Sequence, residues 1–217
     1  MPVDYHAIIF DCDGVIVDTE TISNRVMFEL LQESDIAVSL ETIHKEFTGY
    51  TTQHNLDAIE ALTHKKVPDH FLSEYKARFQ KHIDLYLEPI QGITEVLSKI
   101  QTPIAMATNA TRKEMDYKLN KIGLIEKFKT RFCVDDVVHG KPAPDMYVKA
   151  AEALNIPPNK CIVIEDSIAG ITAGVAAGAT VYAYSAMVDS SAQINAGAAE
   201  TFTSMKALET LLGLASK

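Results

Sequence analysis

Cysteine is scarce in this sequence. Three are present, Cys12, Cys133 and Cys161, and no two of them lie at the spacing of a metal site. Three is an odd number and too few for a disulfide framework, on which small secreted domains depend. The count therefore argues against a disulfide scaffold and a cysteine-based zinc site, and it predicts a reducing compartment.

Positive charge is also in short supply. Lys and Arg number 20 against 29 Asp and Glu, which gives a formal net charge of −9 at pH 7. This balance argues against nucleic acid or an anionic membrane as the main partner, so an anionic substrate must be attracted by a local positive site. No basic stretch followed by an apolar one marks a signal peptide, and we expect the protein in the cytoplasm.

Long apolar runs are missing as well. The segment 167–188 has no charge and repeats Gly170, Gly174 and Gly178, a spacing associated with paired membrane helices. Ala, Gly and Thr dominate it, without Leu or Phe, so its transfer into lipid is unfavourable. It divides instead into a helix, a stop at Gly178 and a strand, and we expect no membrane span.

Two nucleotide-binding motifs are absent too, because neither G-x-G-x-x-G nor G-x-x-x-x-G-K-[ST] occurs. What is present is the composition of an ordinary globular protein, 47% hydrophobic and 23% charged. A chain of 217 residues is long enough for one domain, or for a core with a small insert.

The pattern of apolar residues divides the chain. From Asp18 to about Leu87 they recur at helical spacing, which predicts an all-helical insert. Five of the seven histidines lie there without the spacing of metal ligands, and solvated helix faces explain them better. The stretch from Glu88 to Gly92 is the return linker.

After the linker, helices and strands alternate. With the first strand, the sequence predicts strands over 7–10, 103–108, 131–134, 161–164, 180–184 and 201–202. It predicts helices over 93–100, 112–122, 144–154 and 167–177, and a last one from its cap Ser204 to Leu212. This alternation predicts an α/β fold, a doubly wound parallel sheet formed by residues 1–17 and 88–217, with the helical domain at 18–87.

Two carboxylates follow the first strand. The run 7–10 is continuously apolar, as expected of a strand buried on both faces of a parallel sheet. Gly14 permits a tight turn, so Asp11 and Asp13 lie at the edge where open α/β sheets bind ligands. One carboxylate can attack an electrophile while the other transfers a proton, with a divalent cation between them. On this segment alone a pair of turn carboxylates stays open, whereas an EF-hand is excluded because Val15 stands where that loop needs an oxygen ligand.

Two further loops carry groups that bind anions. Thr108 and Asn109 end a strand before a helix, which makes an anion site, although on this loop alone an ordinary helix cap is the better explanation. Lys141 stands in a loop stiffened by two prolines, where a fixed cation can neutralise a phosphoryl group. A surface lysine before a helix is the alternative.

A fourth loop adds acidic groups. Glu165 and Asp166 end another apolar strand, and hard oxygen ligands beside Asp11 would complete a Mg²⁺ site. The alternative is again a helix cap, at Asp166 or at Ser167.

Together the four loops resemble a known family. D-x-D-G-V-x-x-D-T, T-N, K-P-x-P and E-D-S-x-x-G, in this order, are similar to the motifs of the haloacid dehalogenase-like hydrolase superfamily. The resemblance covers essentially the whole chain and is to the subgroup of phosphoglycolate phosphatases, β-phosphoglucomutases and sugar-phosphate phosphatases. It implies a Rossmann-like core with an inserted all-helical cap.

The resemblance implies a role for each motif residue. Asp11 would be the nucleophile that forms an aspartyl-phosphate. Asp13 would protonate the leaving alkoxide and then accept a proton from the attacking water. Thr108 and the backbone N–H of Asn109 would hold phosphoryl oxygens, and Lys141 would bridge phosphate and nucleophile.

It also implies a metal. Asp11, the carbonyl of Asp13 and Asp166 would bind Mg²⁺, with Glu165 near the ion or acting through water. True dehalogenases lack the second acid, so Asp13 argues against that chemistry.

The cap is expected to set the substrate. Its loop from Thr48 and Gly49 to Thr52 resembles the specificity loop of the family, which is expected to close over the active site. Mutase-type members carry a His and an Arg where this chain has Ser23 and Thr52. Water is then favoured over a second sugar phosphate as the phosphoryl acceptor.

Arg25 and Arg112 are candidate contacts for a carboxylate or a hydroxyl-rich substrate, and a surface arginine is the alternative for each. The segment 18–25 resembles that of 6-phosphogluconate and related sugar phosphatases. We therefore predict a cytoplasmic Mg²⁺-dependent phosphatase of small phosphorylated metabolites, as a monomer or weak homodimer. A β-phosphoglucomutase is the nearest alternative. A phospho-Asp receiver domain is more remote, because its phosphorylated Asp follows a middle strand and it has no cap.

Overall fold

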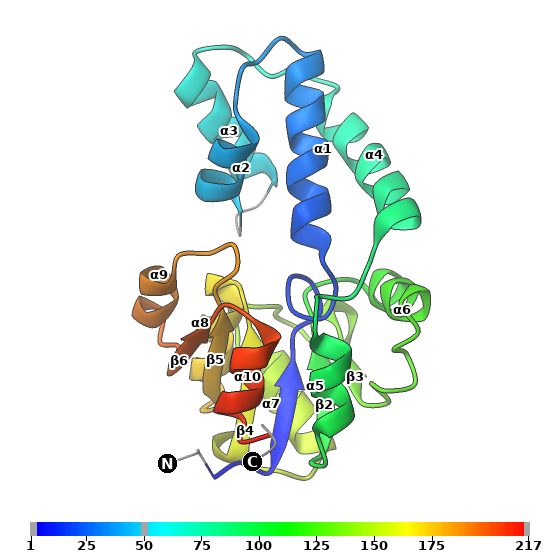
Figure 1. Ribbon diagram of the computed structural model, residues 1–217, viewed down its shortest axis with the longest axis vertical. Helices are drawn as coiled ribbons and strands as arrows, with labels where there is room; N and C mark the ends of the chain where they lie inside the picture. Colours follow the sequence, from blue (N-terminus) through cyan, green and yellow to red (C-terminus); the bar gives the residue numbers. More distant parts are fainter. Residues whose placement is uncertain (1–3, 49–51, 215–217) are drawn as a thin grey trace. The chain divides into compact units, whose positions relative to one another are not determined.

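The computed structural model describes residues 4–48 and 52–214. Contacts divide the chain into two units: Met1–Val17 with Glu88–Lys217, here called the core unit, and Asp18–Leu87, here called the helical unit. Figure 1 shows the strands and surrounding helices of the core unit, and the long helices of the helical unit.

The core unit contains a parallel sheet of six strands in the order β3-β2-β1-β4-β5-β6. The strands are β1 (Ala7–Phe10), β2 (Ile104–Ala107), β3 (Arg131–Phe132), β4 (Cys161–Glu165), β5 (Thr180–Tyr184) and β6 (Glu200–Phe202). The chain builds the sheet outward from β1 on one side and from β4 on the other. The strand order therefore reverses between β1 and β4, and open α/β sheets bind ligands at such a point. The predicted doubly wound α/β class is confirmed.

Helices cover the sheet on both faces. They are α5 (Ile93–Lys99), α6 (Arg112–Lys121), α7 (Asp145–Ala153), α8 (Ile168–Ala176), α9 (Ser190–Asn195) and α10 (Met205–Leu211), with short 3₁₀ turns at Val134–Asp136 and Pro158–Lys160. Helix α7 contacts β1, β2 and β3, and α8 contacts β4 and β5. Helices α5 and α10 contact each other and lie in front of the strands in Figure 1.

The central strand shows why its sequence is apolar throughout. Ala7 and Ile9 belong to one buried cluster with Tyr147 of α7, and the alternate residues Ile8 and Phe10 are equally without exposure. A strand covered on both faces cannot alternate polar and apolar residues. Each such Ile or Phe contributes about 2–3 kcal/mol when it leaves water.

The helical unit consists, in its described residues, of α1 (Thr19–Glu33), α2 (Leu40–Phe47), α3 (Thr52–Thr63) and α4 (Phe71–Tyr86). Helix α1 contacts both α2 and α4. Asp18 and Ser39 cap α1 and α2 by accepting backbone N–H bonds. Across residues 4–48 and 52–214, no helix of either unit has the length and apolarity that a bilayer crossing needs.

Several element ends lie one residue from the predicted bounds, and three differences have a clear physical reason. Helix α9 was not predicted, because its sequence SSAQIN has no apolar periodicity. Strand β3 ends at Phe132, two residues early, because a 3₁₀ turn begins at Val134 and the N–H of Cys133 donates to Asp136. Strand β2 begins at Ile104, since Pro103 has no N–H to donate.

Candidate active site

Three neighbouring strands end in polar residues at one edge of the sheet. Asp11 follows β1, Thr108 follows β2, and Glu165 ends β4. Because β1 pairs with both β2 and β4, these residues stand side by side where the strand order reverses. They are buried, with exposures of 6%, 1% and 0%. Buried polar groups of this kind require partners.

The ammonium group of Lys141 links two of the carboxylates. Its Nζ lies 2.5 Å from Oδ1 of Asp11 and 2.6 Å from Oε1 of Glu165, and its side chain is 3% exposed. The ring of Tyr147 lies 4.9 Å from the same Nζ. Burying charges costs several kcal/mol per ion unless their geometry satisfies them. Here one cation serves two anions, so the surface-lysine alternative does not hold.

Glu165 is bonded through both of its oxygens. Oε1 accepts from Lys141 and from the Tyr147 hydroxyl at 2.8 Å. Oε2 accepts from the N–H groups of Asp166 and Ser167, each at 2.9 Å, and from the Ser167 hydroxyl at 3.0 Å. Burial acts to raise the pKa of Glu165, but Lys141 and these bonds hold that pKa below its ordinary value. Glu165 is therefore an anion in the fold.

The pKa of Asp11 shifts in the opposite direction. Burial raises its pKa to about 7, the charges of Glu165 and Asp13 add to the rise, and Lys141 opposes it. Burial acts to lower the pKa of Lys141, yet Asp11 and Glu165 raise it well above its ordinary value. One ammonium cannot neutralise two carboxylates, and the negative charge of Asp11 is the one that is less well compensated. A second cation beside Asp11 would keep it ionised near neutral pH.

The donor set fits such a cation. One oxygen from each of Asp11, Glu165 and Asp166 lies within 4.8 Å of the others. Three carboxylates against the single ammonium of Lys141 leave two negative charges. Carboxylate oxygens are the ligands that hard divalent cations prefer.

Two glycines leave the space that the acidic groups occupy. A Cβ on Gly14 would lie 2.1 Å from Oδ2 of Asp166, and one on Gly170 would lie 1.6 Å from Oε1 of Glu165. Gly14 also has a φ of +76°, a conformation that favours glycine. The turn after β1 and the start of α8 can therefore approach the carboxylates only because these positions lack side chains.

Asn109 ties the second loop to the third. Its Nδ2 donates to the carbonyl of Lys141 at 3.1 Å, and its Oδ1 accepts from the N–H of Lys141 at 2.9 Å. The hydroxyl oxygen of Thr108 accepts from the N–H of Ala110 at 3.1 Å. Helix α6 is capped by Thr111, and α8 by Ser167. The helix-cap alternatives therefore fail for Thr108, Asn109 and Asp166.

Asp13 has a partner that the sequence did not suggest. Lys118 of α6 places its Nζ 2.5 Å from Oδ1 and 2.6 Å from Oδ2 of Asp13. The Lys118 side chain is 12% exposed and that of Asp13 is 30% exposed. Burial acts to lower the pKa of Lys118, but Asp13 raises it above its ordinary value. The second carboxylate thus has a cation of its own.

Comparison with known proteins decides the family. Residues 8–184, most of the chain, match the haloacid dehalogenase-like hydrolase family. The chain is a haloacid dehalogenase-like hydrolase.

Relatives of this hydrolase act on phosphorylated carbohydrates. A 6-phosphogluconate phosphatase from Escherichia coli is 31% identical over 186 residues, which cover 83% of this chain and 82% of that protein. A phosphorylated carbohydrates phosphatase from Thermotoga maritima is 30% identical over 176 residues, covering 79% and 81%. A solved haloacid dehalogenase family hydrolase from Deinococcus radiodurans, with bound phosphate and sodium, has a TM-score of 0.86 at 32% identity and covers 98% of each chain.

Two predicted substrate contacts, Arg25 and Arg112, are paired with other groups of the protein. Arg25 is 69% exposed and pairs with Glu29 at 2.9 Å. The guanidinium of Arg112 bonds to Asp136 and to the carbonyl of Arg131, and these two partners lie in β3 and the turn after it. Both remain predictions as substrate contacts.

The predicted specificity loop is described at its two ends. The Thr48 hydroxyl is buried and accepts from Nδ2 of Asn24 at 2.9 Å. Gly49 lies outside the described residues. Thr52 begins α3. Their contact with substrate also remains a prediction.

Sequence reasoning missed three residues that support the site. Besides Lys118 they are Tyr147, which donates to Glu165, and Gln193 of α9. Gln193 has no exposure, and its Nε2 donates to the carbonyl of Asp166 at 2.7 Å and to that of Tyr184 at 3.0 Å. The one available signal was Tyr147, a polar aromatic three residues after the K-P-x-P motif.

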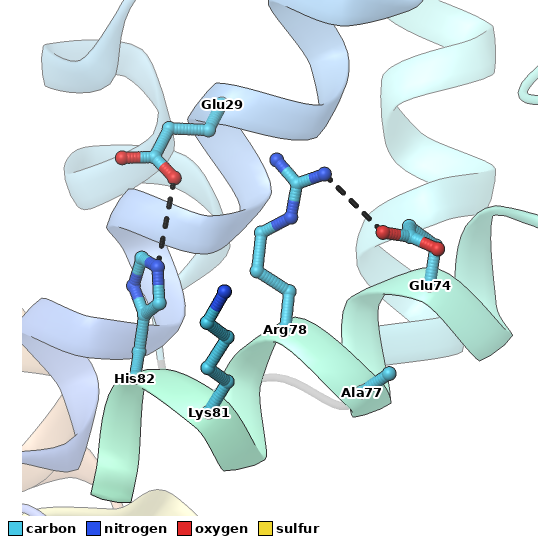
Figure 2. Close-up of a pocket in the computed structure, with 6 residues that line it drawn as sticks. All are labelled: Glu29, Glu74, Ala77, Arg78, Lys81 and His82. Carbon is cyan, nitrogen blue, oxygen red and sulfur yellow. Dashed lines mark hydrogen bonds and ion pairs between the residues drawn. The ribbon is translucent and has the colours of Figure 1, made fainter. Parts of the chain in front are cut away.

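The helical unit has a hollow of about 400 Å³ between α1 and α4, lined by Glu29, Glu74, Ala77, Arg78, Lys81 and His82. Figure 2 shows Arg78 directed at Glu74 and His82 at Glu29, with N–O distances of 3.2 and 3.9 Å. Four of its six lining residues thus form two pairs, and none of the six resembles a buried, activated nucleophile. The hollow is not a second candidate active site.

Proposed function

We propose that the protein is a Mg²⁺-dependent phosphatase of small phosphorylated metabolites, namely sugar phosphates or phosphorylated sugar acids. One observation carries the proposal: Lys141 bridges Asp11 and Glu165 at 2.5 and 2.6 Å, beside the further carboxylate of Asp166. Such a site offers a buried carboxylate nucleophile and two places for positive charge, which phosphoryl transfer requires.

In the first step, an oxygen of Asp11 attacks phosphorus and the bond from phosphorus to the ester oxygen breaks. That oxygen takes the proton of Asp13, so the sugar leaves as a neutral alcohol. The Thr108 hydroxyl and the N–H of Asn109 bind phosphoryl oxygens, and Lys141 neutralises the charge between phosphate and nucleophile. The phosphoryl group is then an aspartyl-phosphate on Asp11.

In the second step, Asp13 acts in the opposite direction. As a carboxylate it accepts a proton from water while the water oxygen attacks phosphorus. The bond between phosphorus and Asp11 breaks, inorganic phosphate leaves, and both acids return to their starting states. One water is consumed for each ester cleaved.

Mg²⁺ would be held by Asp11, Asp166 and the carbonyl of Asp13, with Glu165 near it or acting through water, and it would supply the charge that stabilises the phosphoryl oxygens. The raised pKa of metal-free Asp11 supports this assignment, because a divalent cation is what its surroundings lack.

The substrate class is inferred from the relatives that act on 6-phosphogluconate and phosphorylated carbohydrates. Ser23 and Thr52 stand where mutases carry His and Arg, which favours water as the acceptor. In the helical unit the Ser23 hydroxyl bonds to that of Tyr75 at 2.8 Å, a neutral pair where a second phosphate would need a cation. We propose that the protein acts in the cytoplasm.

The test is release of inorganic phosphate from sugar phosphates, phosphorylated sugar acids and phosphoglycolate, with Mg²⁺ and with EDTA. Asp11→Asn is the test variant. Asp69→Asn is the matched control, because it makes the same change on a carboxylate that is 96% exposed. We expect Mg²⁺-dependent release from wild type and the control, and none from Asp11→Asn. Mass spectrometry after acid quenching should find one phosphoryl group on the peptide that contains Asp11.

Other outcomes would identify the alternatives. Isomerisation of a sugar phosphate that depends on a sugar bisphosphate would identify a mutase. A phospho-Asp that persists for minutes without phosphate release would identify a receiver domain. Release that Asp11→Asn does not change would contradict the mechanism.

A further inference from the structure

We infer that Lys118 is a positioning residue for the reaction, which holds the carboxyl group of Asp13 where it meets the leaving-group oxygen. The inference rests on the proposed function, in which Asp13 is the general acid. No motif of the family resemblance includes Lys118, and no pattern in the sequence distinguishes it from other lysines.

The ion pair between Lys118 and Asp13 involves both carboxylate oxygens and is here called the clamp. A single ammonium lies 2.5 and 2.6 Å from the two oxygens of one carboxylate, and the Lys118 side chain is 12% exposed. Surface ion pairs gain little because water competes for both partners. This lysine is largely withdrawn from water, in contrast to the 69% exposed Arg25 in its pair with Glu29.

Both backbones at the clamp are fixed by other contacts. Helix α6 begins with a capping box between Thr111 and Glu114 and buries Met115 and Leu119. On the other side, the N–H of Gly14 donates to the carbonyl of Val17 at 2.9 Å and holds the turn after β1. Lys118 is thus presented from a rigid element.

The side chain of Asp13 is less constrained than its backbone. Within residues 4–48 and 52–214, Lys118 is the residue that pairs with its carboxylate. A carboxyl group that rotates freely about its χ angles is seldom within hydrogen-bond reach of the ester oxygen. A misplacement of about 1 Å costs on the order of 100-fold in rate. Lys118 removes that freedom.

Substrates with different leaving groups distinguish a positioning role of Lys118 from a purely structural one. A sugar alkoxide needs a proton to depart, whereas p-nitrophenolate departs without one. If Lys118 acts by placing Asp13, its loss slows the first step for the sugar ester and spares the first step for p-nitrophenyl phosphate. A variant that is merely less well folded loses the same fraction of activity with both substrates.

The experiment compares Lys118→Met, which keeps chain length and removes the charge, with Lys113→Met, at an exposed lysine of the same helix. Rapid quenching measures phosphorylation of the enzyme by p-nitrophenyl phosphate and by the sugar ester that wild type hydrolyses fastest. For Lys118→Met we expect a rate within about threefold of wild type for the first and at least about thirtyfold lower for the second. Lys113→Met should match wild type with both.

A double variant provides a second measurement. If Lys118 acts through Asp13, Lys118→Met lowers the rate with the sugar ester far less in an Asp13→Asn background than in wild type. Equal losses in the two backgrounds, or equal losses with the two substrates, would overturn the inference. Failure of the proposed function looks different, because wild type would then release no phosphate from either ester.

Discussion

The two units of the molecule bury polar side chains of different kinds. Among the described residues of the helical unit the buried polar side chains are all neutral: Thr19, Asn24, Thr48 and Asn55. Among the described residues of the core unit they are Asp11, Thr108, Lys141, Glu165, Gln193 and Glu209, and four of these six are ionisable groups in ion pairs.

The two units differ in whether the polar side chains that they bury are charged. Burying a charge is costly, so a fold retains one where a partner or a reaction needs it. Glu209 shows the structural case, since Lys99 and Lys206 bond to it at 2.6 and 2.8 Å and it does not belong to the site. Asp11, Lys141 and Glu165 meet where the strand order reverses, and there we propose that the reaction is what retains the buried charge. The described residues of the helical unit bury hydrogen-bonding groups that carry no charge.

The largest expected effect comes from filling the space around the buried charges. In Gly170→Ala the new Cβ would lie 1.6 Å from Oε1 and 2.0 Å from Cδ of Glu165, which has no room to move. We expect a loss of at least about 3 kcal/mol in the free energy of unfolding, measured with urea. Gly178→Ala is the control, because its φ of +87° brings backbone strain while nothing lies within 4 Å of its Cβ; it should cost about 1 kcal/mol. Equal losses of stability in Gly170→Ala and Gly178→Ala would show that Glu165 is not closely packed.

The buried charge of Asp11 should next appear as a pH dependence. Its pKa is raised from 3.8 to about 7 in the fold, so the folded chain holds this proton more tightly than the unfolded chain. Metal-free wild type therefore loses stability as pH rises from about 4 to about 7, and Asp11→Asn lacks this loss. Between about pH 5 and about pH 8, unfolding in urea with EDTA should show the variant gaining on the order of 2 kcal/mol relative to wild type.

Mg²⁺ should cancel that gain, because it stabilises the wild-type carboxylate and not the amide. Asp69→Asn, on an exposed carboxylate, should follow the wild-type pH curve throughout. Parallel pH curves for wild type and Asp11→Asn would mean that the fold does not raise the pKa of Asp11.

One buried amide in each unit gives a matched comparison. Gln193 bonds to the carbonyls of Asp166 and Tyr184 and accepts from the Ser185 hydroxyl at 2.5 Å. Replacing it by Leu removes three buried hydrogen bonds, and we expect a loss of about 2–3 kcal/mol in the free energy of unfolding. The Nδ2 of Asn24 bonds to Thr48 at 2.9 Å and to His44 at 3.0 Å.

Asn24→Leu should cost about 1 kcal/mol, because the half-buried His44 can turn to water. Gln53→Leu, on an exposed amide, should cost nothing measurable. Gln193→Leu should also weaken Mg²⁺ stabilisation measured by thermal unfolding, since it releases the backbone of Asp166. A larger loss of stability for Asn24→Leu than for Gln193→Leu would contradict the view that the buried amide of the core unit depends more on its hydrogen bonds.

The part of the site that lies next to its own strand was predictable from the sequence. Asp11 and Glu165 follow apolar runs, and the ends of parallel strands meet at one edge, so their proximity follows from the fold class. Whether Thr108 and Asn109 serve as caps was not predictable, because Thr111 caps the helix equally well from a position nearby.

The supporting residues depend on tertiary contacts. Lys118 and Asp13 are 105 residues apart, and the lysine looks like any other on a polar helix. Tyr147 lies on the face of α7 that packs on the sheet, where an aromatic residue is expected for packing alone. Gln193 stands in a helix without apolar periodicity, so neither its element nor its burial could be predicted.

The smallest expected effect concerns the ion pairs of the helical unit. Arg78 bonds to Glu33 at 2.6 and 3.0 Å and to Glu74 at 3.2 Å, but the two glutamates are 58% and 49% exposed. Water competes for exposed carboxylates and salt screens them, so Glu33→Gln should change thermal stability less than any variant above. A double-mutant cycle with Arg78→Met, run at low and at high salt, should show a weak coupling that salt abolishes. A strong coupling that persists at high salt would mean that the helical unit also depends on charges withdrawn from water, and the contrast between the units would fail.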